Sequence, residues 1–207
     1  MGAVTKVGMI VFDAIERLDI SGPLDVIGWT QRVGGGSLEI HLLSVTGDPV
    51  RDHLLDKPMA VDGSTADFGG FDLFLVPGGS QGVFLQDKPL IAETRRLSEG
   101  SRITASICTG AFLIAATGLA EGRRMTTHWY SARGFKTMFP EVLLQEDQRY
   151  VRDGDLWSSA GISAGIDMSL ALVAAYWNDH VSKRCQGIMQ YFPEPPWTLE
   201  EVKAIGH

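Results

Sequence analysis

Short runs of apolar residues alternate along the chain with longer helical patterns. The first run, Lys6 to Phe12, is almost continuously apolar, as the central strands of a sheet covered on both faces are. Further strands are predicted at 38–45, 59–62, 72–76, 102–107 and 125–127, helices at 21–33, 89–98, 109–117, 131–138, 166–177 and 179–191, and a hairpin at 149–158. This alternation predicts an α/β fold, a mostly parallel sheet with helices on both faces.

The length and composition favour one globular domain, 1–207. The 207 residues are 44% apolar, which is enough for a continuous core. The net charge is -7 and the basic residues are spread thinly, so neither nucleic acid nor an anionic membrane surface is an expected partner. The start, Met1 to Lys6, lacks the features of a signal peptide, and no apolar stretch is long enough to span a bilayer. We therefore expect a cytoplasmic protein.

Only two cysteines occur, Cys108 and Cys185, and they are far apart in the sequence. Without a secretion signal, two such cysteines indicate reduced thiols rather than a disulfide framework. The cysteines and histidines show no close pairing of the Cys-x-x-Cys or His-x-x-x-His kind. We therefore expect no metal site.

Cys108 lies in Ser106-Ile107-Cys108-Thr109-Gly110, where the predicted strand 102–107 meets a helix. Small residues around a nucleophile are typical of a nucleophile elbow, because the strained turn excludes large neighbours. A helix start directs its positive end and free N–H groups at the sulfur, so the pKa of the thiol is expected below its free value of roughly 8.5. The alternative, a buried structural cysteine, is the interpretation we favour for Cys185, which lies in mid-helix.

The loop after strand 72–76 contains Gly78 and Gly79. The carboxyl ends of parallel strands share one edge of the sheet, so this loop is expected beside the cysteine turn. Paired glycines let backbone N–H groups approach a ligand, and together with the Thr109 N–H they would form an oxyanion hole. Taken alone, the Gly-Gly pair fits an ordinary tight turn better than a ligand-binding loop.

The loop after the first strand contains Asp19, within Leu18-Asp19-Ile20-Ser21-Gly22-Pro23. Its apolar neighbours predict a partly buried carboxyl. Ser21 is the better candidate for the helix cap, with Pro23 in the first turn. A carboxyl beside a thiolate has a raised pKa and can shuttle protons.

His128 follows the predicted strand 125–127, within Thr126-Thr127-His128-Trp129. No Asp or Glu stands in an obvious orienting position beside it. A role as base, a role in binding and a structural role in the core all remain open for this side chain.

Five motifs together resemble the ThiJ/PfpI superfamily, whose flavodoxin-like fold is related to the class I glutaminases. They are the segments 18–23, 77–79, 106–110, 126–129 and 159–167, and the match runs from about Val7 to Trp197. Within the superfamily the likeness is greatest to the isocyanide hydratases, where the carboxyl near the cysteine is Asp, as Asp19 is here, rather than the commoner Glu. Thr109 replaces the His that follows the cysteine in the protease-like branch, which argues against a Cys-His peptidase.

The resemblance implies a hydro-lyase that converts isocyanides to N-substituted formamides without a cofactor. Cys108 would be the nucleophile that forms a thioimidate, Asp19 the acid/base and Thr109 a pocket residue. Gly161 and Ile162 would begin a helix packed near the cysteine. The resemblance also implies a homodimer.

Two other functions remain open. One is another cofactorless thiol hydratase or hydrolase, such as a glyoxalase-like enzyme acting on an α-ketoaldehyde. The other is a redox sensor in which oxidation of Cys108 is the event. The same motifs also occur in sensor domains of AraC-type regulators, but the chain ends at His207, so we expect no DNA-binding part.

Overall fold

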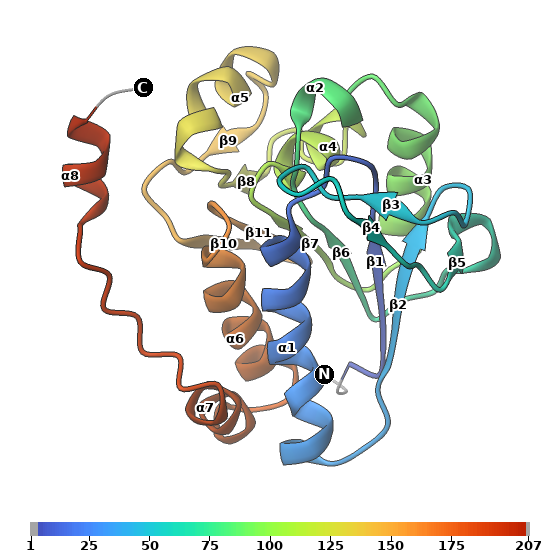
Figure 1. Ribbon diagram of the computed structural model, residues 1–207, viewed down its shortest axis with the longest axis vertical. Coiled ribbons are helices and arrows are strands. Elements are labelled where there is room, and N and C mark those ends of the chain that lie inside the picture. The colour runs from blue at the N-terminus through green and yellow to red at the C-terminus, as the bar shows by residue number, and fades with distance from the viewer. Residues whose placement is uncertain (1–3, 206–207) are drawn as a thin grey trace.

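The computed structural model describes residues 4–205, which are organised around a seven-stranded sheet in the order β10-β11-β7-β6-β1-β2-β5 (Figure 1). The parallel strands are β1 (Lys6–Ile10), β2 (Glu39–Ser44), β5 (Gly63–Ser64), β6 (Leu73–Val76), β7 (Thr104–Ile107) and β11 (Leu156–Ser159). Strand β10 (Tyr150–Asp153) is antiparallel to β11 at the edge, which confirms the predicted hairpin. The predicted fold class is confirmed. Residues 1–3 and 206–207, which include part of the predicted start and the ends of the predicted domain, lie outside the described residues.

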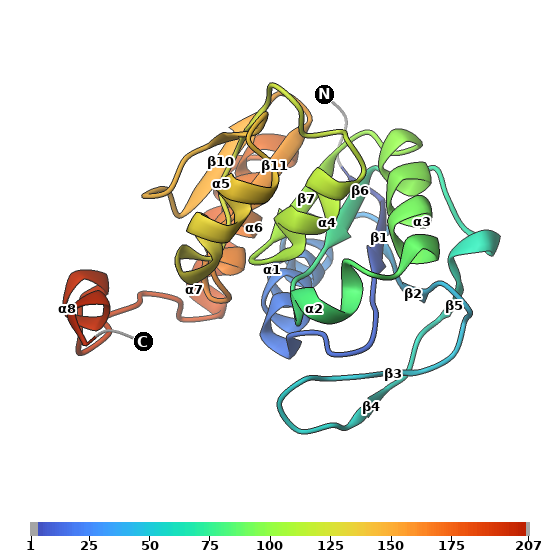
Figure 2. The ribbon, with the colours of Figure 1, turned by 90° about the horizontal axis from the view of Figure 1, so that it is seen from above.

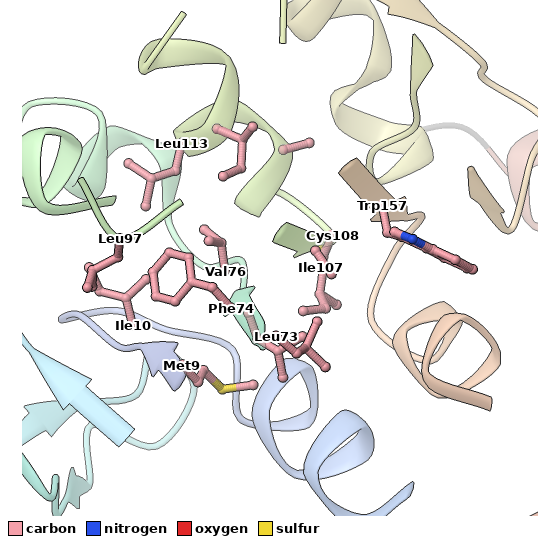
Figure 3. Packing of buried hydrophobic residues seen from close by; sticks show 14 of the residues in the cluster. Met9, Ile10, Leu73, Phe74, Val76, Leu97, Ile107, Cys108, Leu113 and Trp157 are labelled. Carbon is pink, nitrogen blue, oxygen red and sulfur yellow. The ribbon is translucent and has the colours of Figure 1, made fainter. Parts of the chain in front are cut away.

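Helices cover both faces of this sheet (Figures 1 and 2). One face carries α1 (Arg17–Gly34), α6 (Ala164–Tyr176) and α7 (Asp179–Ile188), and the other carries α3 (Lys88–Glu99) and α4 (Gly110–Ala116). Successive strand side chains point to opposite faces. In Figure 3, Met9 and Leu73 lie on the α1 side, whereas Ile10 and Phe74 lie on the side of α3 and α4, and all four are fully buried. The strands are therefore locked between two apolar layers, and only the loops at their ends are free to form a site.

The start of α1 differs from the prediction. The helix begins at Arg17, so Asp19 lies in its first turn rather than in a preceding loop. Glu16, not Ser21, is the N-cap, and its carboxylate accepts a first-turn backbone N–H at 3.2 Å. The pattern was misleading because proline is common in the first turn, whereas here Pro23 lies inside the helix and has no N–H to donate to the Asp19 carbonyl.

Several short elements also differ from the prediction. The predicted strand 59–62 is replaced by β4 (Pro58–Met59), which is antiparallel to β3 (Val50–Arg51), and by β5 at the sheet edge. The strand predicted at 125–127 is β8 (Arg124–Met125), which pairs with β9 (Leu143–Leu144) outside the main sheet. Helix α5 (Ala132–Met138) follows the prediction, but α2 (Gln81–Phe84) and α8 (Leu199–Ala204) were not predicted, because helices this short show little periodicity.

Helix α8 lies away from the sheet, at the end of an extended segment that follows α7 (Figures 1 and 2). Single 3-10 turns occur at Thr65–Asp67 and Trp129–Ser131. Among residues 4–205, no helix combines the length and the apolar character needed to cross a membrane.

The contact between β6 and the start of α4 requires a glycine at position 110. A Cβ on Gly110 would lie 2.1 Å from the Val76 carbonyl oxygen, so Gly110→Ala should lower the free energy of unfolding by at least about 2 kcal/mol. The matched control is Gly28→Ala in α1, where a Cβ meets nothing within 4 Å and should raise stability by about 0.5–1 kcal/mol. Urea denaturation measures both variants. Equal effects in the two would contradict the steric explanation.

Candidate active site

Cys108 lies on the turn between β7 and α4 with φ of 56°, in the left-handed region that residues with a side chain rarely adopt. Two hydrogen bonds hold this turn. The Cys108 N–H donates to the Ser159 carbonyl at 3.2 Å, and the Thr127 hydroxyl donates to the Cys108 carbonyl at 2.9 Å. The predicted nucleophile elbow is therefore confirmed as a backbone conformation.

Asp19 reaches the sulfur from the first turn of α1. Its side chain is fully buried, and Oδ2 accepts the Gly78 N–H at 2.9 Å. The carboxyl also hydrogen-bonds the Cys108 thiol, and Oδ1 meets no N–H or O–H donor within residues 4–205. Burial, with a contribution from the charge of Glu16, raises the pKa of Asp19 to about 7, which is the direction expected from the sequence.

The thiol of Cys108 does not follow the prediction. Burial, followed by the charge of Asp19, raises its pKa to about 12, so the expected lowering by the helix start is wrong. The N–H groups of Ile162 and Thr109 hydrogen-bond the sulfur and act in the expected direction, but burial outweighs them. Burial therefore favours the protonated thiol, which the Asp19 carboxyl hydrogen-bonds.

The amides of Gly78 and Gly79 are engaged within the protein, so the predicted oxyanion hole is not formed by them. Gly78 N–H donates to Asp19, and Gly79 N–H donates to Thr109 Oγ1 at 2.9 Å. The Thr109 hydroxyl in turn donates to the Gly79 carbonyl at 2.9 Å. A Cβ on Gly78 would lie 2.8 Å from Asp19 Oδ2, which explains the glycine. These two amides therefore hold the side chains of Asp19 and Thr109 in place.

Gly161 and Ile162 form a turn before α6, which begins at Ala164, so they do not start that helix as expected. Ile162 has φ of 41°, and this conformation directs its N–H at the sulfur. Gly161 lies against the ring of His128, where a Cβ would be 2.1 Å from Cδ2. Residue 161 must therefore be small for the Ile162 N–H to reach Cys108.

The structure places His128 at the site, where the sequence left its role open. Its Nδ1 accepts the Tyr130 N–H at 3.2 Å, so in the neutral ring the proton resides on Nε2. Burial lowers the pKa of His128, which favours this neutral form. His128 therefore offers a hydrogen-bond donor rather than a base.

A cleft of about 510 Å³ opens above the cysteine. Of the predicted residues, Cys108, Thr109, Gly79, His128 and Ile162 line it, while Asp19, Gly78 and Gly161 lie behind this lining. The other lining residues were not predicted from the sequence, and they are Glu16, His53, Ser80, Gln81, Gly82, Tyr130 and Ser131. Gln81 Nε2 donates to Ser131 Oγ at 2.8 Å and so joins α2 to the opposite wall.

Glu16 and His53 come together through the hairpin of β3 and β4. The Asp52 carboxylate, 1% exposed, accepts a hydrogen bond from Arg17 at 2.6 Å and backbone N–H groups within its own turn. This anchoring brings His53 Nδ1 to 3.6 Å from Glu16 Oε2 at the mouth of the cleft. No local sequence signal predicts a contact between positions this far apart.

No group of three or more His, Cys, Asp or Glu side chains in the described part of the chain is arranged to hold a metal ion. Cys108 and Cys185 are both free thiols, and both are buried.

A family model described as the DJ-1/PfpI family matches residues 5–175. The chain belongs to the DJ-1/PfpI family. Within known proteins it is similar to the isonitrile hydratase of Pseudomonas putida, with 30% identity over 196 residues that cover 93% of this chain and 81% of the hydratase. A solved ThiJ/PfpI family protein from Pseudomonas syringae superposes with a TM-score of 0.85, at 24% identity, over 98% of this chain and 81% of that one.

Relatives in this family differ in what they do. The HTH-type transcriptional regulator CdhR of Pseudomonas aeruginosa is 32% identical over 136 residues, but this match covers 65% of the present chain and only 39% of the regulator. Family membership alone therefore does not define the activity, which depends on the residues around the cysteine.

The burial of Asp19 should make stability depend on pH. Because its folded-state pKa is raised to about 7 from the ordinary 3.8, its contribution is fully present below pH 3.8 and is lost as the pH rises through 7. Relative to Asp19→Asn, the parent should lose on the order of 4 kcal/mol of unfolding free energy between these limits, at about 1.4 kcal/mol per pKa unit. Urea denaturation at several pH values tests this. Parallel pH curves for the two proteins would contradict the raised pKa.

Proposed function

We propose that this protein is an isocyanide hydratase, a cofactor-free hydro-lyase of one domain that makes N-substituted formamides. The observation that carries the proposal is the buried Asp19 carboxyl, which hydrogen-bonds the Cys108 thiol beneath a cleft. The similarity to an isonitrile hydratase over 93% of the chain supports it.

The first step adds the thiol across the terminal carbon of the isocyanide R–N≡C. The Cys108 proton passes to the Asp19 carboxylate while the sulfur bonds to that carbon. Asp19 then returns the proton to the same carbon, which gives the thioimidate R–N=CH–S on Cys108. The isocyanide carbon must gain both a bond to sulfur and a proton. A protonated thiol beside a carboxylate can supply both, so this pair suits the reaction.

The second step hydrolyses the thioimidate. Water bonds to the imidate carbon through its oxygen, and one of its protons reaches the nitrogen through Asp19. The carbon–sulfur bond then breaks, the sulfur regains a proton from the hydroxyl through Asp19, and R–NH–CHO leaves. One carboxyl with a pKa near neutrality serves as base and as acid in turn.

The raised thiol pKa favours this reaction over a peroxide sensor. Oxidation of cysteine proceeds through the thiolate, and a thiol with a pKa of about 12 supplies little of it at neutral pH. The proposed hydratase reaction does not require a thiolate before the substrate binds, because Asp19 takes the proton as the carbon–sulfur bond forms.

The proposal includes a cytoplasmic homodimer. Reduced Cys108 and Cys185 suit the cytoplasm. Phe192, Trp197 and Ile205, at the C-terminal end, are 64%, 67% and 84% exposed, which is unusual for large apolar side chains and fits contact with a second copy. Light scattering at micromolar concentration should give twice the 22.5 kDa mass of the chain. A monomer mass would count against the dimer.

The activity is tested with a simple alkyl isocyanide, whose conversion to the formamide is followed by chromatography. The parent should produce the formamide, and Cys108→Ala should produce none. Asp19→Asn should lose at least about a hundredfold in kcat/KM, the typical contribution of a general acid/base. Cys185→Ala is the matched control, because it removes the other buried thiol and should keep normal turnover.

Methylglyoxal and hydrogen peroxide separate the alternatives. Turnover of methylglyoxal with no formamide from the isocyanide would replace the hydratase with a glyoxalase-like enzyme. Peroxide oxidation of Cys108 that alters a partner interaction, with no turnover of either compound, would identify a sensor.

A further inference from the structure

A second cavity, of about 770 Å³, lies next to the catalytic cleft and shares His128 and Ile162 with it as a common wall. Its far wall is helix α8, which stands opposite β10 in Figure 1 and contributes Leu199 and Lys203. Each cavity alone falls in the size range that accommodates a drug-sized ligand. Their combined volume is larger than a small isocyanide would fill.

The second cavity combines an apolar part with charged side chains of both signs. Trp129, Ile162 and Leu199 form the apolar part, which suits an uncharged substituent. The two basic lining residues are paired, because Arg149 contacts Asp167 and Lys203 lies 4.0 Å from Asp147. Asp147 itself lines the cavity, together with Glu146 and Glu200.

An isocyanide is linear through its substituent, nitrogen and carbon, so its substituent extends away from the terminal carbon, which the sulfur attacks from the side. The cleft above Cys108 is bounded by the hydrogen-bonded Gln81 and Ser131 on one side and by the Glu16–His53 pair on another. The wall formed by His128 and Ile162 is the one with a further cavity behind it.

We propose that the second cavity binds the nitrogen substituent of the substrate, so that the enzyme prefers isocyanides carrying a long arylalkyl group over small ones. Helix α8 then determines specificity, although it lies far from Cys108 in the sequence. This inference rests on the proposed hydratase function.

The test compares methyl isocyanide with 4-phenylbutyl isocyanide. In the parent, kcat/KM should be at least about tenfold higher for the arylalkyl compound, within the range that added apolar groups contribute in a matching pocket. Leu199→Trp fills the cavity from α8 and should lower this ratio about tenfold. Val202→Trp is the matched control on the same helix, because Val202 lies with Trp197 and Ile205 outside the cavity, and it should keep the parent ratio.

A readout without turnover separates this inference from the function on which it rests. Iodoacetamide and its N-(4-phenylbutyl) derivative are compared as alkylating reagents for Cys108 at alkaline pH, where more thiolate forms, and peptide mass spectrometry gives their rates. The parent should favour the bulky reagent, and Leu199→Trp should remove that preference while Val202→Trp keeps it. If no isocyanide is hydrated, the proposed function fails and the alkylation rates alone decide on the cavity.

Two results would overturn the inference. One is a parent that treats small and bulky compounds alike in alkylation. The other is a change in the ratio of bulky to small rates that is the same in Leu199→Trp and Val202→Trp.

Discussion

The hydrogen bond from the Gly78 N–H to Asp19 Oδ2 is the contact on which the site depends. It joins the first turn of α1 to the loop after β6, two elements far apart in the sequence. It fixes the orientation of the carboxyl, which also hydrogen-bonds the Cys108 thiol. The contact needs a glycine, because a Cβ at position 78 would crowd both Asp19 and Thr109. The acid is therefore positioned by the backbone and not by a flexible side chain.

Burial then decides which atom holds the proton. The N–H groups of Thr109 and Ile162 stabilise a thiolate, but removing the sulfur from water and placing it beside Asp19 has the larger effect. The same burial raises the pKa of Asp19 and so favours its uncharged form. In the hydration that we propose, the pair passes a proton at the moment of bond formation.

The family to which this chain belongs has relatives that include an isonitrile hydratase and a transcriptional regulator, so the fold by itself does not select the function. The residues around the Cys108 turn must therefore determine the function. In this chain the surroundings are the Glu16–His53 pair at the mouth and the cavity closed by α8. His53 and helix α8, which complete them, belong to segments outside the central sheet.

The sequence by itself determined the parallel sheet, the elbow at Cys108 and the burial of Asp19, because each follows from local facts: strand-like apolar runs, small residues flanking a nucleophile, and apolar neighbours of a carboxyl. Only the tertiary structure decided the start of α1, the pKa direction of Cys108, the use of the Gly78 and Gly79 amides, and the meeting of Glu16 with His53. These depend on contacts between distant segments and on desolvation, which sums over every neighbour in space and leaves no trace in the order of residues along the chain.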